Sequence, residues 1–347
     1  MMSTPLNVGL IGFGLSGRYF HAPFLKVNPH FKLTKVVTRN AASVHEFDPS
    51  IEVISSTEAL LADDSIDLVF VCTPNDLHFP YAKAALEAGK HVVIEKPFTN
   101  TTAEADELIA LAEQKKLVVT AYQNRRWDAD FLTIQKLLND GTLGEVIEFE
   151  GHFDRFRPEV AQGTWKEVAA AGAGTLYNLG PHLIDQALVL FGTPQKVTTT
   201  IKIVRSGGET DDYFDIRLDY ADKSVILKAS LMVFENNLRY IIHGTKGSFI
   251  KYGLDIQEDT LRKNTLPNTQ NWGEEPENQW GTLYTEAGKA TIKTLPGHYT
   301  PFYDNIYEAI AEGKELIVKP QHARNTTRVM ELAIESSRLG KTMDFEG

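Results

Sequence analysis

The sequence predicts a two-domain α/β protein, with an N-terminal doubly wound parallel sheet and a C-terminal α/β domain built on a large, mostly antiparallel, open-faced sheet. Its 347 residues are enough for two separate cores. Up to about residue 122, short strands rich in Val, Ile and Leu alternate with helical segments, as in a parallel sheet covered on both faces. From 195 to 252, the strands alternate apolar and polar residues, which is typical of an antiparallel sheet with one open face. We therefore divide the chain into domains 1–122 and 123–347.

The N-terminal domain is expected to begin with a buried strand, LNVGLIG (6–12), and a helix, RYFHAPFLKV (18–27), that Pro23 interrupts. Further strands are predicted for KLTKVVT (32–38), DLVFVCT (67–73), HVVIEK (91–96) and LVVTAY (117–122). The helix FPYAKAALEAGK (79–90) stops at Gly89, a suitable C-cap. Thr101 and Glu104 form a capping box in front of the next helix, ADELIALAEQKK (105–116).

The C-terminal domain has a different rhythm. Helices are predicted over 128–141, where Gly141 ends the helix, and over 182–192, where His182 lies near the first turn. Strands are predicted over 145–155, 196–204, 213–220, 224–234 and 239–252. Residues 253–295 are expected to be a long irregular excursion, and two helices, 300–313 and 325–340, follow it.

Composition and charge exclude several classes of protein. The formal net charge of −11 repels nucleic acid and anionic membranes, and the sequence has no basic patch. The N-terminal apolar run is short and broken by glycine, so it fits neither a secretion signal nor a membrane span. One cysteine, Cys72, excludes an intrachain disulfide and a CxxC metal site, and we expect it to be a buried strand residue in a cytoplasmic protein.

The stretch GLIGFGLSGRYFH (9–21) carries glycines spaced G-x-G-x-x-G. This spacing alone also fits a merely flexible turn, but it lies directly between a strand and a helix. There Gly12 permits the tight turn, Gly14 lets backbone N–H groups approach a pyrophosphate, and Gly17 lets helix and strand pack closely. We therefore interpret the segment, with Phe13 and Leu15 included, as a dinucleotide-binding turn.

The end of the second strand, VVTRN, indicates which dinucleotide binds. An NAD enzyme usually places Asp or Glu there to hold the ribose 2′-hydroxyl. Thr38 and Asn40 suit hydrogen bonds to a 2′-phosphate, and the Arg39 guanidinium suits an ion pair with it. The prediction is NADP(H), with a solvated surface arginine as the alternative.

Two segments carry a resemblance to a known family. CTPNDLHFPYAKAALEAGKHVVIEKPF (72–98) and GAGTLYNLGPHLIDQAL (172–188) resemble the Gfo/Idh/MocA family of NAD(P)-dependent sugar and polyol oxidoreductases, whose hallmark is the tripeptide Glu95-Lys96-Pro97. The resemblance implies a Rossmann domain followed by an open-faced α/β domain, and a bent Lys96–Pro97 peptide, of which the cis isomer is one form. GFGLSGRYFHAPFL, VVTRN and QNRRWDADF look similar to the NADP-dependent scyllo-inositol dehydrogenases within that family.

Lys96 and His182 are the predicted catalytic residues. Lys96 follows a parallel strand at the end where ligands bind, and its ammonium suits stabilisation of a developing alkoxide. His182 is the natural acceptor of the hydroxyl proton, and Asp185, three residues later, is expected to orient the ring or contact substrate. Many inositol dehydrogenases of the family carry aspartate where this chain has Asn178, which we expect to hold a substrate hydroxyl or the imidazole.

The resemblance assigns further residues to the site. By it, the cofactor is lined by residues that follow the third, fourth and fifth strands: Thr73, Pro74, Asn75, Leu77, His78, Glu95, Lys96 and Gln123. Candidates for contact with substrate are Asn124, Arg155 and Trp165, while Arg125 and Arg126 are expected to lock the domains together. For Trp272 and Trp280 the sequence leaves two interpretations open: they close the site, or they lie in a subunit interface.

These residues support one functional hypothesis and leave two alternatives. The hypothesis is an NADP(H)-dependent dehydrogenase that moves a hydride between a cyclitol or sugar alcohol and the nicotinamide, with no metal and no nucleic acid or membrane partner. The alternatives are another sugar or ketone reductase of the family, and a non-catalytic regulator that binds a dinucleotide. The open sheet face favours a homodimer or homotetramer.

Overall fold

The computed structural model describes residues 4–235 and 238–346, apart from the side chain of Trp165. The chain forms two compact units. Unit 1 contains residues 1–124, 257–272 and 299–324, and unit 2 contains 125–256, 273–298 and 325–347. The first segment of unit 1 ends close to the predicted boundary, and two later segments join it.

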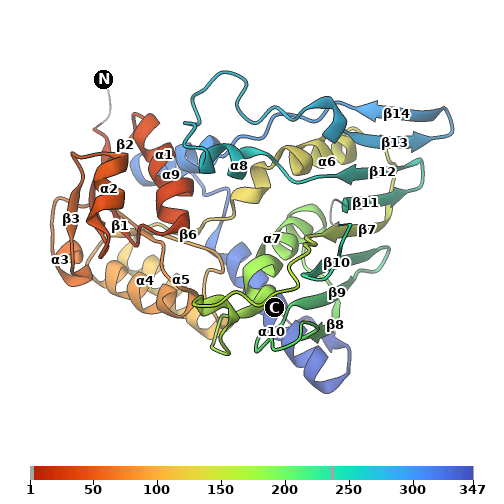
Figure 1. Cartoon of the computed structure of the whole chain (residues 1–347), viewed down its shortest axis with the longest axis horizontal. Helices are drawn as coiled ribbons and strands as arrows, with labels where there is room; N and C mark the ends of the chain where they lie inside the picture. Colours follow the sequence, from red (N-terminus) through yellow and green to blue (C-terminus); the bar gives the residue numbers. More distant parts are fainter. Residues whose placement is uncertain (1–3, 236–237, 347) are drawn as a thin grey trace. The chain divides into compact units, whose positions relative to one another are not determined.

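Unit 1 is built on a six-stranded parallel sheet with the order β3-β2-β1-β4-β5-β6. This order is that of the doubly wound dinucleotide-binding fold, so the predicted fold class of this part is confirmed. Figure 1 labels β1, β2, β3 and β6 of this sheet. The strands are β1 (Leu6–Ile11), β2 (Phe31–Val37), β3 (Glu52–Ile54), β4 (Leu68–Val71), β5 (His91–Ile94) and β6 (Val119–Ala121). The helices are α1 (Ala22–Val27), α2 (Ala41–Phe47), α3 (Thr57–Leu61), α4 (His78–Glu87), α5 (Thr102–Lys115), α8 (Gln257–Arg262) and α9 (Thr300–Glu312), with a π-helical turn at Ser16–His21.

The inner strands of this sheet are apolar because both of their faces are covered. Every residue of β4 is buried, and Val71 and Ile94 pack with Ala82, Leu86 and Leu108 of α4 and α5. The capping box of Thr101 and Glu104 is present at the start of α5, as predicted. The break at Pro23 is also confirmed, because a π-helical turn ends at His21 and α1 begins at Ala22. The short elements α2, β3 and α3 were not predicted.

Unit 2 is built on a nine-stranded sheet with the order β14-β13-β12-β11-β7-β10-β9-β8-β15. Its strands are β7 (Val146–His152), β8 (Lys196–Lys202), β9 (Tyr213–Asp219), β10 (Ser224–Ser230), β11 (Leu238–Gly244), β12 (Gly247–Tyr252), β13 (Gly281–Thr285), β14 (Gly288–Ile292) and β15 (Met343–Asp344). All neighbouring pairs are antiparallel except β7 with β10, which confirms the predicted mostly antiparallel sheet.

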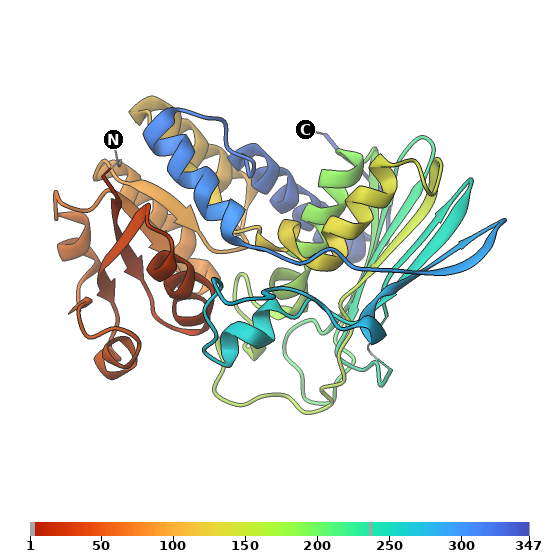
Figure 2. The ribbon, with the colours of Figure 1, turned by 90° about the horizontal axis from the view of Figure 1, so that it is seen from above.

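Helices lie on one face of this sheet (Figure 2). They are α6 (Ala129–Asn139), α7 (Gly174–Phe191) and the later part of α10 (Pro320–Leu339). Leu183 of α7 and Val329 of α10 pack with Phe214 and Leu227 of the strands in one buried core. On the other face, side chains such as Arg217 and His243 are exposed, as the alternating pattern predicts.

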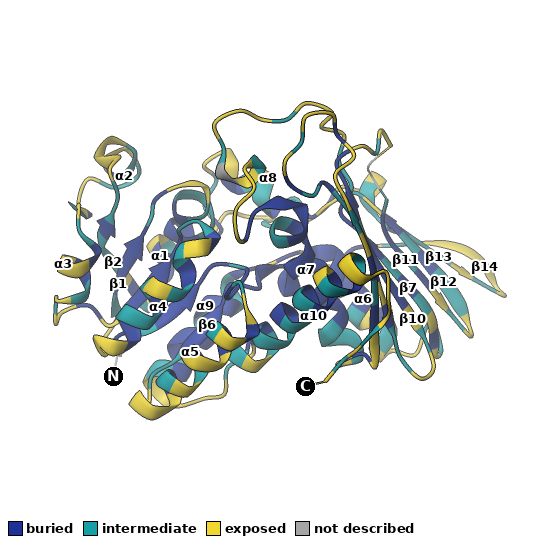
Figure 3. Ribbon diagram, turned by 90° about the horizontal axis from the view of Figure 1, so that it is seen from below, coloured by how far each residue is buried: buried dark blue, intermediate teal, exposed yellow. Residues whose placement is uncertain are grey.

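Three predictions about elements were wrong. The segment 239–252, predicted as a strand, forms two strands, β11 and β12, that pair with each other. Residues 253–295 are not wholly irregular, because they form α8 and the hairpin β13–β14, which pairs with β12. The hairpin escaped recognition because β14 is an almost wholly exposed edge strand, coloured as exposed in Figure 3, and so has no apolar alternation. The helix predicted to open beside His182 begins at Gly174, with Pro181 inside it, so His182 lies within the helix.

Candidate active site

The glycine turn of unit 1 has the geometry that close backbone approach requires. Gly12 has φ +100°, and a Cβ there would lie 2.5 Å from the Cys72 carbonyl oxygen. A Cβ on Gly17 would lie 2.5 Å from the Gly12 carbonyl oxygen. Apart from the adjoining backbone and the two chain neighbours, no described atom lies within 4 Å of a Cβ built on Gly14, so the surface over this glycine is open. Phe13 is buried under the turn, and Leu15 is exposed beside it.

The turn after β2 is held by its own side chains. The Thr38 hydroxyl accepts the backbone N–H of Asn40 at 3.2 Å, and the Asn40 carboxamide oxygen caps α2 by accepting the N–H of Ser43 at 3.2 Å. The Arg39 side chain is exposed and makes no ion pair with the described residues. Arg18 differs from Arg39 in this respect, because its guanidinium forms an ion pair with Glu46 at 3.0 Å.

The turn after β4 contains five predicted cofactor residues. Asn75 is buried, Thr73, Pro74 and Leu77 are half-buried, and the Thr73 hydroxyl has no hydrogen-bond partner among the described residues. His78 is fully buried, and its ring nitrogens lie 2.7 Å from the Pro97 carbonyl oxygen and 3.0 Å from that of Thr73. Burial lowers the pKa of His78, whereas its contacts with the two carbonyl oxygens raise it, and the ring joins the turns that follow β4 and β5.

The Glu95-Lys96-Pro97 tripeptide directly follows β5. The Lys96–Pro97 peptide bond is cis, one of the forms implied by the resemblance. Glu95 is buried, and one of its carboxylate oxygens accepts the backbone N–H of Lys96 at 3.1 Å. The Lys96 side chain is half-buried. Past β6, Gln123 and Asn124 are buried, and the Gln123 carboxamide oxygen has no partner among the described residues.

In unit 2, His182 lies within α7 and is buried, with its ring 6.3 Å from the ring of Phe153. The helix begins at Gly174, where φ is +90°, and Asp211 caps it by accepting the N–H of Leu176 at 2.6 Å. Burial raises the pKa of Asp211 to about 6. Because α7 packs on the sheet by its apolar face, the backbone around His182 is fixed.

The structure pairs Asp185 with Arg126. Both carboxylate oxygens accept hydrogen bonds from the guanidinium, at 2.8 and 2.7 Å, and both side chains are buried. Arg125 forms an ion pair with Asp128 at 3.0 Å. The two arginines that we expected to lock the domains together therefore each hold a carboxylate within unit 2.

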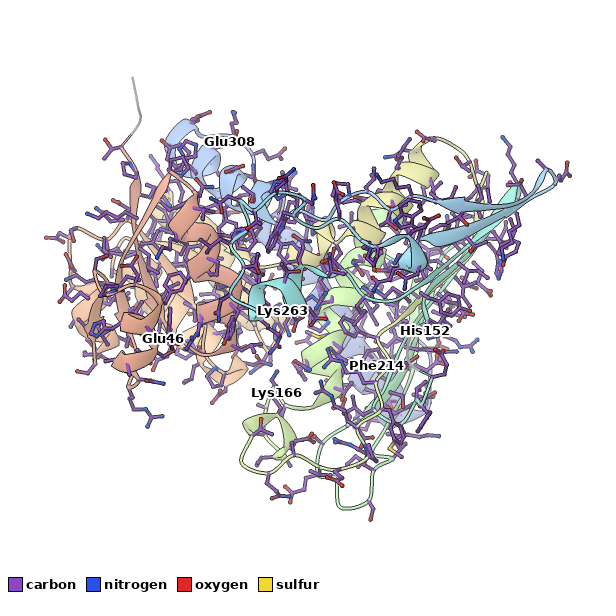
Figure 4. All side chains as sticks on the ribbon, turned by 45° about the horizontal axis from the view of Figure 1, so that its top comes forward. Glu46, His152, Lys166, Phe214, Lys263 and Glu308 are labelled. Carbon is purple, nitrogen blue, oxygen red and sulfur yellow. The ribbon has the colours of Figure 1, made fainter. Side chains whose placement is uncertain are left out.

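Asn178 lies one turn before His182 on α7. Its carboxamide oxygen accepts a hydrogen bond from the Lys166 ammonium at 3.0 Å, and Figure 4 labels Lys166 in the segment that precedes α7. Arg155 is half-buried, with its guanidinium 5.2 Å from the centre of the Phe153 ring. The predicted substrate contact of Trp165 concerns a side chain outside the described part of the structure.

Sequence reasoning missed several polar residues near these positions. His21 lies between Glu95 and Tyr303 in unit 1, and Arg239 lies between Asp130 and the carbonyl of His152 in unit 2. His21 ended the quoted glycine stretch, but a histidine in an apolar helix gives no further signal. Tyr303 and Arg239 come from distant segments, so only the fold brings them to these places.

The fold and these residues define an oxidoreductase with a dinucleotide-binding fold. The chain matches the family model for the NAD-binding Rossmann fold over residues 6–123 and that for the C-terminal alpha/beta domain over 135–345. It belongs to the Gfo/Idh/MocA oxidoreductase family. No helix among the described residues has the length and apolar character needed to cross a membrane.

Similar proteins cover the whole chain. The oxidoreductase YdgJ of Escherichia coli is 42% identical over 346 residues, which is 99% of each chain. The scyllo-inositol 2-dehydrogenase (NADP(+)) IolW of Bacillus subtilis is 41% identical, covering 98% of this chain and 96% of its own. Among solved structures, the oxidoreductase yvaA of Bacillus subtilis superposes with a TM-score of 0.95 at 41% identity, covering 98% of both chains.

Proposed function

We propose that this protein is an NADP(H)-dependent dehydrogenase that oxidises a secondary alcohol of a cyclitol or sugar, and that scyllo-inositol is the first substrate to test. The observation that carries the proposal is the set of polar groups at the carboxyl ends of β1, β2, β4, β5 and β6, where ligands bind in open α/β sheets. The 41% identity to IolW, whose name gives both a substrate and a cofactor, supports the choice of the test substrate.

The residues of unit 1 fit a dinucleotide. The open surface over Gly14 leaves room for a pyrophosphate, which a side chain at this position would occupy. The Thr73 hydroxyl and the Gln123 carboxamide oxygen are buried polar atoms without partners among the described residues, and a ligand with hydroxyl and amide groups would satisfy them. We therefore propose that these residues, with Asn75 and Leu77, hold the ribose and nicotinamide.

We propose NADP(H) rather than NAD(H) because of Arg39. Its guanidinium is exposed and makes no ion pair with the described residues, whereas a carboxylate at this turn would repel a 2′-phosphate. Thr38 keeps its hydroxyl proton for donation, since the oxygen already accepts from the backbone N–H of Asn40. The Asn40 carboxamide oxygen caps α2, which leaves its N–H groups for the phosphate.

The bound nicotinamide supplies the acceptor for the hydride in oxidation and the donor in reduction. We propose that His182 accepts the proton of the substrate hydroxyl, since imidazole titrates near working pH. The Lys96 ammonium stabilises the oxygen as it becomes negative. Asn178 and Arg155 are proposed to hold further substrate hydroxyls, and the Arg126–Asp185 pair to fix the helix that carries His182.

The test is NADP-linked turnover across inositols and aldoses with the wild type, Lys96→Met and His182→Ala. General acid–base assistance contributes roughly 10²–10⁴-fold, so kcat of His182→Ala should fall by that order while NADP affinity stays the same. Lys96→Met should be comparably impaired. His91→Gln is the matched control, because among the described residues the His91 ring accepts a hydrogen bond from the backbone N–H of Val118 in unit 1 and belongs to no proposed site. Full turnover in His182→Ala would remove this residue from the proposed reaction.

The same substrate panel decides between the alternatives. Turnover of an aldose or ketone but not of inositols would identify another reductase of the family, and Asn178 in place of an aspartate is the feature that favours such a shift. NADP binding without any turnover would identify a regulator. We also propose a cytoplasmic homodimer or homotetramer, for which the single buried cysteine and the open sheet face are the support.

A further inference from the structure

A buried series of hydrogen-bonded polar groups connects Tyr303 of α9 with Glu95, the residue before Lys96. The Tyr303 hydroxyl donates to the carbonyl of Phe20 at 2.6 Å. The Nδ1 of His21 lies 3.0 Å from that hydroxyl oxygen, and its Nε2 lies 3.0 Å from one carboxyl oxygen of Glu95. The other oxygen of Glu95 accepts the backbone N–H of Lys96 at 3.1 Å. The series of hydrogen bonds therefore ends at the backbone N–H of Lys96, the proposed catalytic lysine.

The partners in this series of hydrogen bonds determine which atoms of Tyr303 and His21 carry hydrogen. Tyr303 has one hydroxyl proton, and it points to the Phe20 carbonyl, so its oxygen accepts from His21 and Nδ1 of that ring carries hydrogen. A second proton must lie between Nε2 and the Glu95 carboxyl, because a bare nitrogen and an ionised carboxylate would repel each other at 3.0 Å. The pair is either imidazolium with carboxylate or imidazole with carboxylic acid. Its net charge is zero in both forms.

The surroundings exclude water from this pair. The His21 ring packs 4.4 Å from the ring of Tyr122 and 4.8 Å from that of Phe70, and it is fully buried. Burial alone would raise the pKa of Glu95, but the hydrogen bond from His21 and the positive charges of His21 and Lys96 lower it below its ordinary value. The carboxylate form of Glu95 is therefore the favoured one.

Other titratable groups lie near the pair. Burial raises the pKa of the Cys72 thiol and of the Tyr303 phenol, and it lowers the pKa of the His78 imidazole. The charges that act on Glu95 are those of His21, Lys96 and His78. Because the Lys96 charge acts on Glu95, a change in the net charge of the pair acts on the lysine in turn.

We propose that His21 is a positioning residue for Lys96, acting through Glu95: by sharing a proton with the carboxyl, it keeps the pair neutral while Glu95 anchors the lysine backbone. The catalytic role of Lys96 in this inference rests on the proposed function. The proton arrangement of His21 and Glu95 does not depend on it. Without His21, Glu95 carries an uncompensated negative charge next to Lys96 once it is ionised, as it is in the alkaline range where a lysine titrates. The ammonium form of Lys96 is then stabilised.

The first test observes the protons directly and needs no substrate. In protein labelled with ¹⁵N-histidine, long-range ¹H–¹⁵N NMR assigned with His21→Gln should show a protonated Nδ1 on His21 from pH 6 to 9. A bare Nδ1 would overturn the proton arrangement. In the same pH range and above, the titration of Lys96, followed in ¹³C-lysine-labelled protein and assigned with Lys96→Met, should move upward by about one pH unit in His21→Gln.

A double-variant cycle separates positioning from mere structural support. Glu95→Gln keeps an oxygen for the Lys96 N–H and leaves the pair neutral, so the Lys96 titration should stay at the wild-type midpoint. His21→Gln/Glu95→Gln is also neutral and should return to that midpoint. If His21→Gln lowers the melting temperature but leaves the Lys96 titration unchanged, the histidine is only structural and the proposal is wrong. Should the single variant not fold, the wild type and Glu95→Gln still decide, because a lower Lys96 midpoint in Glu95→Gln would show that Glu95 carries an uncompensated charge beside Lys96 in the wild type and would overturn the proposal.

The kinetic consequence is measured separately. With a substrate found in the panel, the alkaline limb of the pH profile of kcat/KM should move upward by about one unit in His21→Gln and return in the double variant. Absence of turnover in the wild type would contradict the proposed function alone, because the NMR titrations do not depend on it. An unchanged alkaline limb together with unchanged titration would contradict the positioning role alone.

Discussion

The choice of cofactor is the prediction that depends most directly on one side chain. We expect Arg39→Ala to lower the preference of the enzyme for NADP over NAD. The side chain is exposed at the end of β2 and makes no ion pair with the described residues, so its removal leaves no buried charge behind. Its loss should therefore act on the ligand and not on the stability of the fold.

The size of the effect follows from the contact. A hydrogen bond to a charged group contributes about 1.5–3 kcal/mol, which corresponds to about tenfold to a hundredfold in affinity. Because the guanidinium is exposed, solvent screens the interaction and the lower end of this range applies. We expect about a tenfold fall in the ratio of kcat/KM for NADP to that for NAD, with kcat for NAD nearly unchanged.

The assay measures kcat/KM for both cofactors in the wild type, in Arg39→Ala and in Arg338→Ala. Arg338 is an exposed arginine near the end of α10, and it controls for the loss of one positive charge. The difference between the two variants should shrink as ionic strength rises. An unchanged cofactor ratio in Arg39→Ala, or a wild type that prefers NAD, would refute the reasoning about the 2′-phosphate.

Three further predictions concern unit 2. Asn178→Asp should convert the hydrogen bond from Lys166 into an ion pair and change the substrate profile in the panel, whereas equal kcat/KM for every substrate would show that position 178 does not contact substrate. Asp185→Ala leaves Arg126 buried without its partner carboxylate. The free energy of unfolding, measured by urea denaturation, should therefore fall by about 3 kcal/mol. A loss below about 1 kcal/mol would contradict this expectation. Because burial raises the pKa of Asp211 to about 6 from 3.8, its proton is bound more tightly in the folded state. The stability that this proton contributes is full below about pH 4, falls as the pH rises to about 6, and amounts to about 3 kcal/mol at most. Asp211→Asn should therefore flatten the dependence of the free energy of unfolding on pH between about pH 4 and 6. An unchanged slope in this variant would show that Asp211 is not the group responsible.

Much of unit 1 was predictable from local patterns. β1, β4 and β5 are short apolar runs between turn residues, and the capping box of Thr101 and Glu104 lies at the predicted helix start. Elements without such a pattern were missed. β3 is an edge strand of three residues, and β14 is almost wholly exposed, so each is recognisable only from the strand with which it pairs.

The sequence by itself determined the fold class, the dinucleotide-binding turn and the family, because these depend on residues that are close together in the chain. Only the tertiary structure revealed the partners of the polar residues. Asp185 pairs with Arg126 from another element, and Tyr303 reaches His21 across 282 positions of the chain. Such contacts arise from the packing of distant segments, and their strength comes from burial, which no local pattern records.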